Sequence, residues 1–266
     1  STMAARSAAF FDLDNTMVRG STLYFLGRAM YKRGYFSRAD ISKFVVANVR
    51  FRLTGTEKPE VIARFQKAAT DFVGGHKLDE LYVIAQSVYD EYVSPALIQG
   101  TIDLAKQHLA EGTEVWLVTA APQDMAKLIA DRLGFTGALG TKAIIEDGVF
   151  TGKLDGKILH GSEKARAVRE LAAERGFSLN NCHAYSDSAS DLPLLQSVGI
   201  PHAINPDARL RIKALAEGWQ MHDFRKFRKL NRWLGPAVSR IVALGDRKST
   251  RLNSSHIPLS RMPSSA

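Results

Sequence analysis

A short apolar run that ends in two acids is the feature that most constrains this chain. Residues 8–11 read Ala-Ala-Phe-Phe, and Asp12 and Asp14 follow directly. A run of this length is typical of a buried strand. Residues i and i+2 of a strand face the same side, so the two acids converge unless the chain leaves the strand between them. Because adjacent carboxylates repel, the stretch predicts either a site for a hard cation such as Mg2+ or an Asp-rich turn.

The residues after this stretch have helical periodicity. Four sets of apolar residues at helical spacing begin near residues 21, 37, 56 and 78. Gly74-Gly75 ends the third set, Pro95 follows the fourth, and Ser21 is suited to cap the first helix. Short links between four such helices predict a small bundle.

From residue 98 onward, strands and helices alternate. The expected strands are 114–119, 182–186 and 202–205, with a hairpin over 141–153 that turns at Asp147-Gly148. The expected helices are 98–109, one from Pro122 to Leu133, one capped by Ser162 that runs to Arg175, a short one from Asp191, and 207–217. This alternation predicts a parallel sheet with helices on both faces.

The predicted fold is therefore α/β, with a doubly wound, Rossmann-like, mostly parallel sheet and an inserted α-helical bundle cap. We expect residues 1–16 and 98–222 to form the core domain and residues 17–97 the cap. Residues 223–246 are expected to form a basic C-terminal helix, and residues 247–266 resemble a disordered, non-native cloning tail.

The basic character of the chain is concentrated near its C-terminus. From residue 222 onward there are ten Lys or Arg residues and two acids, so this stretch carries most of the net charge of +9. Its basic, partly amphipathic part, residues 225–244, suits either peripheral contact with anionic lipid or a solvated helix packed on the body. Nucleic acid is not an expected partner, and the oligomeric state is left open.

Three further observations bear on the cellular setting. No run of about eighteen apolar residues is present, and the first residues lack the basic-then-apolar pattern of a signal peptide. Cys182 is the only cysteine, which excludes an intramolecular disulfide and fits a buried strand residue. We therefore expect a cytoplasmic protein. The seven histidines show no metal-ligand spacing and are interpreted as surface or packing residues.

Polar residues stand where the predicted strands end. Asp12 and Asp14 end the first strand, Thr119 the second and Asp187 the third. Ligands of doubly wound sheets bind outside the carboxyl ends of the strands. A carboxylate can attack phosphorus, and a transferring phosphoryl group needs cations and hydrogen-bond donors around it. This set predicts phosphoryl transfer.

The same residues resemble a known family. Asp12 to Thr16, Val118-Thr119, Lys164 and Asp187 to Asp191 are similar, in order, to the four motifs of the haloacid dehalogenase-like superfamily. The likeness covers residues 7–221 and is greatest to the phosphoserine-phosphatase-like branch, which carries a helical cap after the first motif. It implies a Mg2+-dependent phosphomonoester hydrolase that forms an aspartyl-phosphate and acts on a small phosphorylated metabolite.

The resemblance also implies roles for individual residues. Asp12 would be the nucleophile, Asp14 the general acid and base, Thr119 a phosphate ligand, and Lys164 the cation beside the nucleophile, with Lys153 and Lys157 as nearby rivals. The implied metal set is Asp12, Asp14 through its carbonyl, Asp187 and Asp191. The implied substrate-binding set is Ser21, Thr119, Ala120, Lys164 and Ser190.

Two positions depart from the branch. Ser21 stands where phosphoserine phosphatases have a Glu nine residues after the nucleophile, and Ser190 stands where they tend to have Asn. Both departures argue against phosphoserine as the substrate. Arg19, Arg50 and Arg52 are further candidates to face the site. The alternatives are a phosphoserine phosphatase proper, a phosphotransferase, and a non-catalytic regulatory or membrane-surface protein on the same fold.

Overall fold

The computed structural model describes residues 6–35 and 74–225. The helices predicted to begin near residues 37 and 56, Arg50, Arg52 and the stretch from residue 226 onward lie outside the described residues. The described part up to Asp223 belongs to one compact unit, and Phe224 begins a second. Within the described ranges, no helix combines the length and apolar character needed to cross a membrane.

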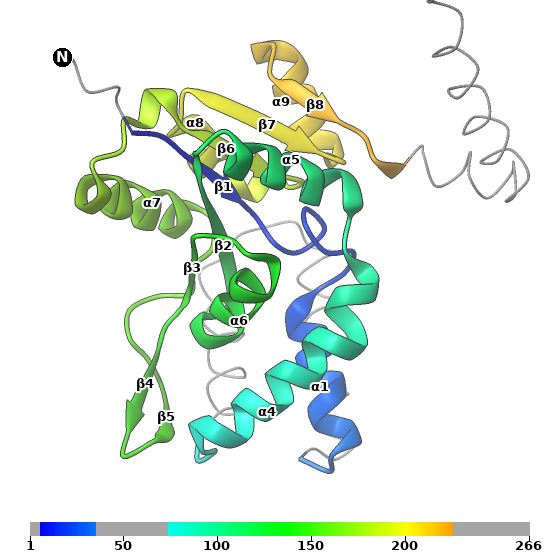
Figure 1. Cartoon of the computed structure of the whole chain (residues 1–266), viewed down its shortest axis with the longest axis vertical. Helices are drawn as coiled ribbons and strands as arrows, with labels where there is room; N and C mark the ends of the chain where they lie inside the picture. Colours follow the sequence, from blue (N-terminus) through cyan, green and yellow to red (C-terminus); the bar gives the residue numbers. More distant parts are fainter. Residues whose placement is uncertain (1–5, 36–73, 226–266) are drawn as a thin grey trace, which may run out of the picture. The chain divides into compact units, whose positions relative to one another are not determined.

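A six-stranded parallel sheet organises the first unit (Figure 1). Its strand order is β3-β2-β1-β6-β7-β8, so the N-terminal strand is central. The strands are β1 (Ala8–Phe11), β2 (Glu114–Pro122), β3 (Gly137–Thr141), β6 (His183–Ser186), β7 (Ile200–Ile204) and β8 (Gln220–His222). Every neighbouring pair in it is parallel, which confirms the predicted fold class. The edge strands β3 and β8 were not predicted.

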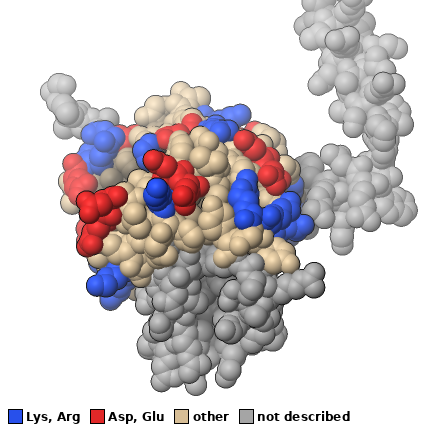
Figure 2. All heavy atoms as spheres, turned by 90° about the horizontal axis from the view of Figure 1, so that it is seen from below, with Lys and Arg blue, Asp and Glu red and all other residues tan. Residues whose placement is uncertain are grey.

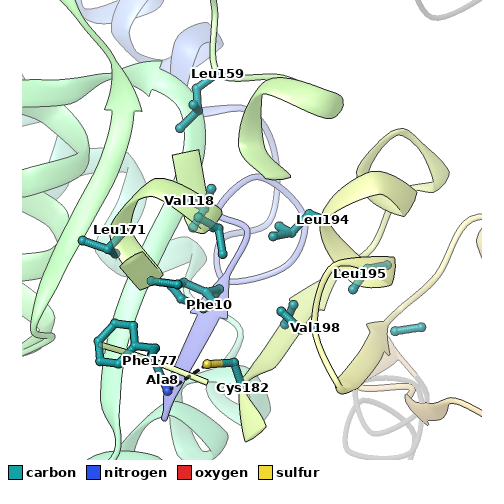
Figure 3. Packing of buried hydrophobic residues seen from close by; sticks show 14 of the residues in the cluster. Ala8, Phe10, Val118, Leu159, Leu171, Phe177, Cys182, Leu194, Leu195 and Val198 are labelled. Atoms are coloured by element: carbon teal, nitrogen blue, oxygen red, sulfur yellow. Dashed lines mark hydrogen bonds between the residues drawn. The ribbon is translucent and has the colours of Figure 1, made fainter. Parts of the chain in front are cut away.

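Helices cover both faces of the sheet. One face carries Phe10, Val118 and Ala184, which share a buried apolar cluster with residues of α7 (Ser162–Arg175), α8 (Leu192–Gln196) and α9 (Ala208–Glu217) (Figure 3). The opposite face carries Phe11, whose ring meets His108 of α5 (Gln99–Ala110). The helix α6 (Gln123–Leu133) packs beside β2 and β3. The alternation of side chains along β1 explains why both faces are apolar.

Cys182 lies inside the apolar cluster, as predicted. It is fully buried, and its Sγ accepts a hydrogen bond of 3.4 Å from the backbone N–H of Ala8 (Figure 3). Burial raises the pKa of this thiol. The thiol is therefore a packing group rather than a nucleophile.

Local signals set several helix boundaries, and two predicted starts need correction. Pro122, predicted to begin a helix, is the last residue of β2, and α6 begins at Gln123. Gly134 ends α6 in the left-handed region with φ of 73°, and the Asp207 side chain caps α9 by accepting from Leu210 N–H. The prediction that Ser162 caps α7 is wrong, because Gly161 with φ of 56° occupies the cap and Ser162 is the first helical residue. A 3-10 turn, Ala189–Asp191, precedes α8.

The described part of the inserted segment contains two packed helices, α1 (Thr22–Lys32) and α4 (Leu78–Val88) (Figure 1). The predicted fourth helix does not continue regularly through Tyr92. It passes into a π-helix, Tyr89–Val93, and a 3-10 turn, Ser94–Ala96. The two connections to the sheet pair with each other, since Arg19 N–H donates to the Ala96 carbonyl (2.8 Å) and Ile98 N–H to the Met17 carbonyl (2.9 Å).

The predicted hairpin is formed by β4 (Ala143–Glu146) and β5 (Val149–Leu154), which are antiparallel. Its turn residues, Asp147 and Gly148, both have positive φ, as a type I′ turn requires. The hairpin also pairs with the return leg of the inserted segment. Gly75 N–H donates to the Phe150 carbonyl (2.8 Å), and Phe150 N–H donates to the His76 carbonyl (3.0 Å).

Charged side chains of both signs are interspersed on the face drawn in Figure 2. Elsewhere on the described surface, ion pairs form within one helix, such as Lys127–Asp131 (2.6 Å) and Lys213–Glu217 (2.6 Å). Such exposed pairs contribute about 0.3–0.5 kcal/mol each. This face therefore has no strong field of one sign.

Candidate active site

All nine residues predicted for the site line one cavity of about 320 Å3. They come from the carboxyl ends of β1, β2 and β6, from α7 and from the start of α1. These residues are Asp12, Asp14, Ser21, Thr119, Ala120, Lys164, Asp187, Ser190 and Asp191. Groups more than a hundred residues apart in the sequence therefore meet at one edge of the sheet.

Asp12 is fixed at the end of the central strand. Its N–H donates to the Tyr185 carbonyl of β6 (2.9 Å), which continues the sheet ladder by one residue. Its carboxylate accepts from Lys164 Nζ at 2.6 Å and from Thr16 Oγ1 at 3.1 Å. The residue is only 6% exposed. Burial raises the pKa of Asp12 to about 7, although the charge of Lys164 opposes the shift.

Lys164 is the cation that reaches the carboxylates. It lies in the first turn of α7, is 3% exposed, and also donates to Asp191 Oδ2 at 2.8 Å. Burial by itself disfavours the ammonium, but the charges of Asp12 and Asp191 outweigh it and hold the pKa of Lys164 above its ordinary value. The rivals lie outside the cavity, since Lys153 is exposed and Lys157 pairs with Glu163 at 3.4 Å.

Asp187 shares a hydroxyl with Asp12. Thr16 Oγ1 lies 3.1 Å from Asp12 Oδ2 and 3.3 Å from Asp187 Oδ1. A hydroxyl has one hydrogen, so it cannot fully satisfy both carboxylates at once. Burial, followed by the charges of Asp12 and Asp191, raises the pKa of Asp187 to about 8. Negative charge is thus confined here without sufficient compensation from the described residues.

Asp191 supports Lys164 and retains an unsatisfied atom. Its Oδ2 accepts from Lys164 Nζ and from Ser186 Oγ, the latter at 2.7 Å. Its Oδ1 is buried and has no hydrogen-bond partner within the described part of the chain. A buried acceptor without a partner is costly, which marks this region as one where a ligand or ordered water would be stabilising.

The donor set suits a magnesium ion. Among the described residues, four carboxylates and one ammonium line the cavity, so the charges of these groups do not balance. No three His, Cys, Asp or Glu side chains in residues 6–35 and 74–225 are arranged to hold a metal by themselves. Mg2+ commonly takes one or two carboxylates and completes its shell with waters and substrate phosphate. The adjoining carboxylates of Asp12 and Asp187 fit that mode.

Asp14 does not continue the regular strand, because β1 ends at Phe11. Asn15 adopts φ of 61°, and the Leu13 carbonyl accepts from Met17 N–H in the turn that follows. The Asp14 carboxylate is directed to the start of α1, where Oδ1 accepts from Thr22 N–H (3.0 Å) and Thr22 Oγ1 (2.8 Å). Burial raises the pKa of Asp14, and the bonds from Thr22 oppose the shift.

The remaining predicted residues form the polar wall of the cavity. Thr119 is buried within β2, which continues beyond the predicted end to Pro122, and its Oγ1 accepts from Ala121 N–H at 3.1 Å. The Ala120 carbonyl accepts from Thr141 Oγ1 at 2.8 Å. Ser190 N–H donates to Ser188 Oγ at 3.2 Å in the turn after β6. The Ala120 carbonyl is therefore held by the neighbouring strand β3, whereas Thr119 and Ser190 are held within their own strand or turn.

Ser21 has a local structural role. It is the N-cap of α1, and its Oγ accepts from Tyr24 N–H at 3.4 Å, as predicted. Arg19 is exposed and does not line the cavity. The described wall near α1 therefore offers a serine hydroxyl where the resembling branch has a carboxylate.

Several cavity residues were not predicted. They are Asn15, Thr22, Leu23, Ala121, Ile158, His160 and Ser188. Thr22 follows Ser21 at the helix start and has no distinctive sequence signal. Ile158 and His160 lie in the loop between β5 and α7, which periodicity does not resolve. The one available signal was the proximity of both residues to Lys164 in the sequence.

Comparisons with known proteins agree with this arrangement. A family model described as haloacid dehalogenase-like hydrolase matches residues 9–196. The chain is 45% identical over 252 residues to a Mycobacterium tuberculosis protein named phosphoserine phosphatase SerB1, covering 92% of this chain and 82% of that protein.

Two solved structures are similar in fold. A protein with unknown function from Bordetella pertussis Tohama I has a TM-score of 0.74 at 27% identity and covers 83% of this chain and 100% of its own. A phosphoserine phosphatase, solved as an analogue of its phospho-aspartyl intermediate, has a TM-score of 0.59 at 18% identity. The match covers 85% of this chain and 99% of that chain. At that identity the second likeness concerns the fold alone.

Proposed function

The chain belongs to the haloacid dehalogenase-like hydrolase family, and we propose that it is a Mg2+-dependent phosphomonoesterase that acts through an aspartyl-phosphate. The observation that carries this proposal is the buried Asp12 carboxylate, 2.6 Å from Lys164 Nζ in a cavity lined by three further aspartates. A structural ion pair would not require this surplus of buried negative charge, whereas a cationic cofactor and a phosphate ester would use it.

In the proposed first step, an Asp12 oxygen attacks phosphorus and the bond to the ester oxygen breaks. Lys164 lies beside the nucleophile and offsets the negative charge that the carboxylate and phosphate bring together. Thr119 lines the same cavity and is suited to donate its hydroxyl hydrogen to a phosphate oxygen. Mg2+, held by Asp12 and Asp187 with support from Asp191, would neutralise phosphate charge when bound.

Asp14 is proposed to handle the protons. Burial raises its pKa, which favours the protonated form that an acid needs. Asp14 gives this proton to the departing ester oxygen, so the alcohol leaves neutral. The resulting carboxylate then takes a proton from the water that attacks the aspartyl-phosphate, which regenerates Asp12 and releases phosphate.

The inserted segment is proposed to act as a cap that selects the alcohol part of the substrate. Among the described residues, the lining contributed by the start of α1 and by the loop before α7 includes Ser21, Leu23 and Ile158, none of which is charged. This favours a small phosphate monoester without a charged amino group near Ser21. Phosphoserine remains a second candidate because a 45% identical relative bears the name phosphoserine phosphatase.

The first test is hydrolysis of p-nitrophenyl phosphate by the purified full chain with Mg2+ and with excess EDTA. We expect turnover only with the metal, and a loss of about 10³-fold or more in Asp12→Asn, since the nucleophile acts as part of a unit. Asp131→Asn is the matched control, because Asp131 is an exposed acid paired with Lys127. An undiminished rate in Asp12→Asn would refute the proposal.

A screen of phosphate esters, including phosphoserine, sugar phosphates and lysophospholipids, then separates the substrate candidates. Product analysis with added alcohols distinguishes hydrolysis from phosphotransfer, since only phosphotransfer yields a new ester. Activity on phosphoserine well above that on the other esters would show that Ser21 does not exclude an amino acid substrate.

A further inference from the structure

We propose that Thr22 is a positioning residue that holds the carboxylate of Asp14 for proton transfer, an inference that rests on the proposed function. Thr22 is the first residue of α1 and is fully buried. It was not a predicted site residue, and its position within the inserted segment links the segment to the proposed acid.

Thr22 contacts the Asp14 carboxylate through two hydrogen bonds. Thr22 N–H and Thr22 Oγ1 both donate to the same oxygen, Asp14 Oδ1, at 3.0 and 2.8 Å. Two donors on one oxygen restrict rotation of the carboxylate more than one donor does. The carboxylate also lies at the N-terminus of α1, where the helix dipole favours negative charge. Together these contacts define one orientation of Asp14.

Asp14 needs this support because its own backbone lies in a turn rather than in a strand. The strand β1 ends at Phe11, and Asn15 has φ of 61°. A general acid must lie within hydrogen-bond reach of the leaving oxygen, and small misplacements lower the rate. Asp12, by contrast, is held by the sheet ladder and by Lys164.

Thr22 also couples the acid to the inserted segment. The helix that begins at Thr22 packs against α4, and the two connections to the sheet are hydrogen-bonded to each other. A displacement of α1 would therefore move the donors that orient Asp14. Asp14 would be correctly oriented only when the start of α1 lies where Thr22 can donate both hydrogen bonds to its carboxylate.

The test compares two substrates of similar shape, p-nitrophenyl phosphate and phenyl phosphate. The nitrophenolate leaves readily without a proton, whereas phenolate depends more on the acid. In Thr22→Val we expect kcat/KM for phenyl phosphate, which reports only the steps up to departure of the alcohol, to fall about 10- to 100-fold, as for a lost hydrogen bond to a charged group. The kcat/KM for p-nitrophenyl phosphate should fall much less, and Thr22→Ser should restore most of the value for phenyl phosphate.

Thr101→Val is the matched control. Thr101 is also a fully buried threonine, but its hydroxyl donates to the backbone carbonyl of Thr16 at 2.7 Å. Any loss in Thr101→Val should be equal for the two substrates. If Thr22→Val does not fold, as judged by circular dichroism, Thr22→Ala replaces it, and Thr22→Ser must still behave like the unmodified chain.

Equal losses in kcat/KM on the two substrates, no loss in Thr22→Val, or a Thr22→Ser variant as impaired as Thr22→Val would overturn this inference alone. An unmodified chain that hydrolyses neither substrate with Mg2+, or an Asp12→Asn variant of full activity, would overturn the proposed function and this inference with it. The two failures are therefore distinguishable in one set of assays.

Discussion

Two polar clusters on the same sheet are built on opposite principles. The carboxylate cluster consists of Asp12, Asp187, Asp191 and Lys164. It lies at the carboxyl ends of β1 and β6, in the 3-10 turn after β6 and in the first turn of α7. The histidine cluster, His108, His183, Tyr185, His202 and His222, joins α5 to β6, β7 and β8 through ring contacts. The first cluster concentrates charge, and the second contains none when its imidazoles are neutral.

Ring nitrogens and the Tyr185 hydroxyl pair with one another within the histidine cluster. His108 Nε2 lies 2.8 Å from the Tyr185 hydroxyl, His183 Nδ1 lies 2.9 Å from His202 Nε2, and His202 Nδ1 lies 3.2 Å from His222 Nε2. A neutral imidazole has one donor and one acceptor, so such pairs match without added charge. Burial lowers the pKa of His108 to about 4 and that of His202 to about 3.

The difference separates a structural polar cluster from a functional one. Neutral groups that pair as donor and acceptor require no ligand or counter-ion. We therefore interpret the histidine cluster as a packing element, in line with the interpretation of the sequence. The carboxylate cluster confines several like charges with one ammonium and leaves Asp191 Oδ1 without a partner among the described residues. Unmatched buried charge indicates a missing ligand more strongly than burial or residue type alone.

Removing the ammonium of the carboxylate cluster should have a larger effect than any change to the histidine cluster. Lys164→Met should lower phosphatase activity by about 100-fold or more, because charge on the transferring group is no longer offset. It should also lower the free energy of unfolding by about 3–5 kcal/mol, because buried carboxylates lose their partner. Urea denaturation and kinetics on the same preparation measure both.

Lys157→Met is the matched control for that prediction. Lys157 is exposed and contacts Glu163 at 3.4 Å, so its loss should cost less than about 0.5 kcal/mol. Comparable losses of activity in the two variants would contradict the role assigned to Lys164 and would indicate that Lys157 takes part in the reaction.

A smaller effect should follow from acidifying the histidine cluster. The pKa values of His108 and His202 are lower in the folded chain than the ordinary 6.5. The unfolded chain therefore takes up protons below pH 6.5 that the folded chain does not, and stability present above pH 6.5 is lost as the pH falls. At pH 5 the expected loss is about 2 kcal/mol for each of the two groups. Glu111 is the acid whose charge opposes the shift at His108.

The double variant His108→Phe with Tyr185→Phe sharpens this prediction. It removes both partners of the 2.8 Å contact, so no buried polar atom of that pair is orphaned. Its unfolding free energy should fall less between pH 7 and pH 5 than that of the unmodified chain, by about 2 kcal/mol. An identical pH dependence would mean that other groups cause the acid sensitivity.

The sequence predicts the central strands because they are apolar and end in polar residues, but it does not reveal β3. That strand reads Gly-Ala-Leu-Gly-Thr, a composition with low strand propensity. Both glycines are required by close packing. A Cβ at Gly137 would lie 2.5 Å from the Trp116 ring, and one at Gly140 would lie 2.8 Å from Gln123 Cα. The strand is thus specified by its neighbours rather than by its own residues.

The sequence predicts which residues form the site but not the contacts that hold them in place. Asp12, Lys164 and Asp187 carry motif spacing, and the structure brings them to one cavity. The bond from Thr22 to Asp14 was not predictable, because it depends on the chain leaving the strand at Phe11 and on where α1 begins. The sequence does not predict the contacts among the histidines either, because residues on separate strands meet only through the order and register of the strands.

The most direct test of the account is to find the phosphoryl group on the chain itself. The full-length protein is mixed briefly with Mg2+ and p-nitrophenyl phosphate, quenched in acid, and mapped by peptide mass spectrometry. The account predicts a phosphoryl group on Asp12 that forms within one turnover and is absent from Asp12→Asn. Steady hydrolysis with no modified Asp12, or with the phosphoryl group on another residue such as His160 or Ser188, would contradict it.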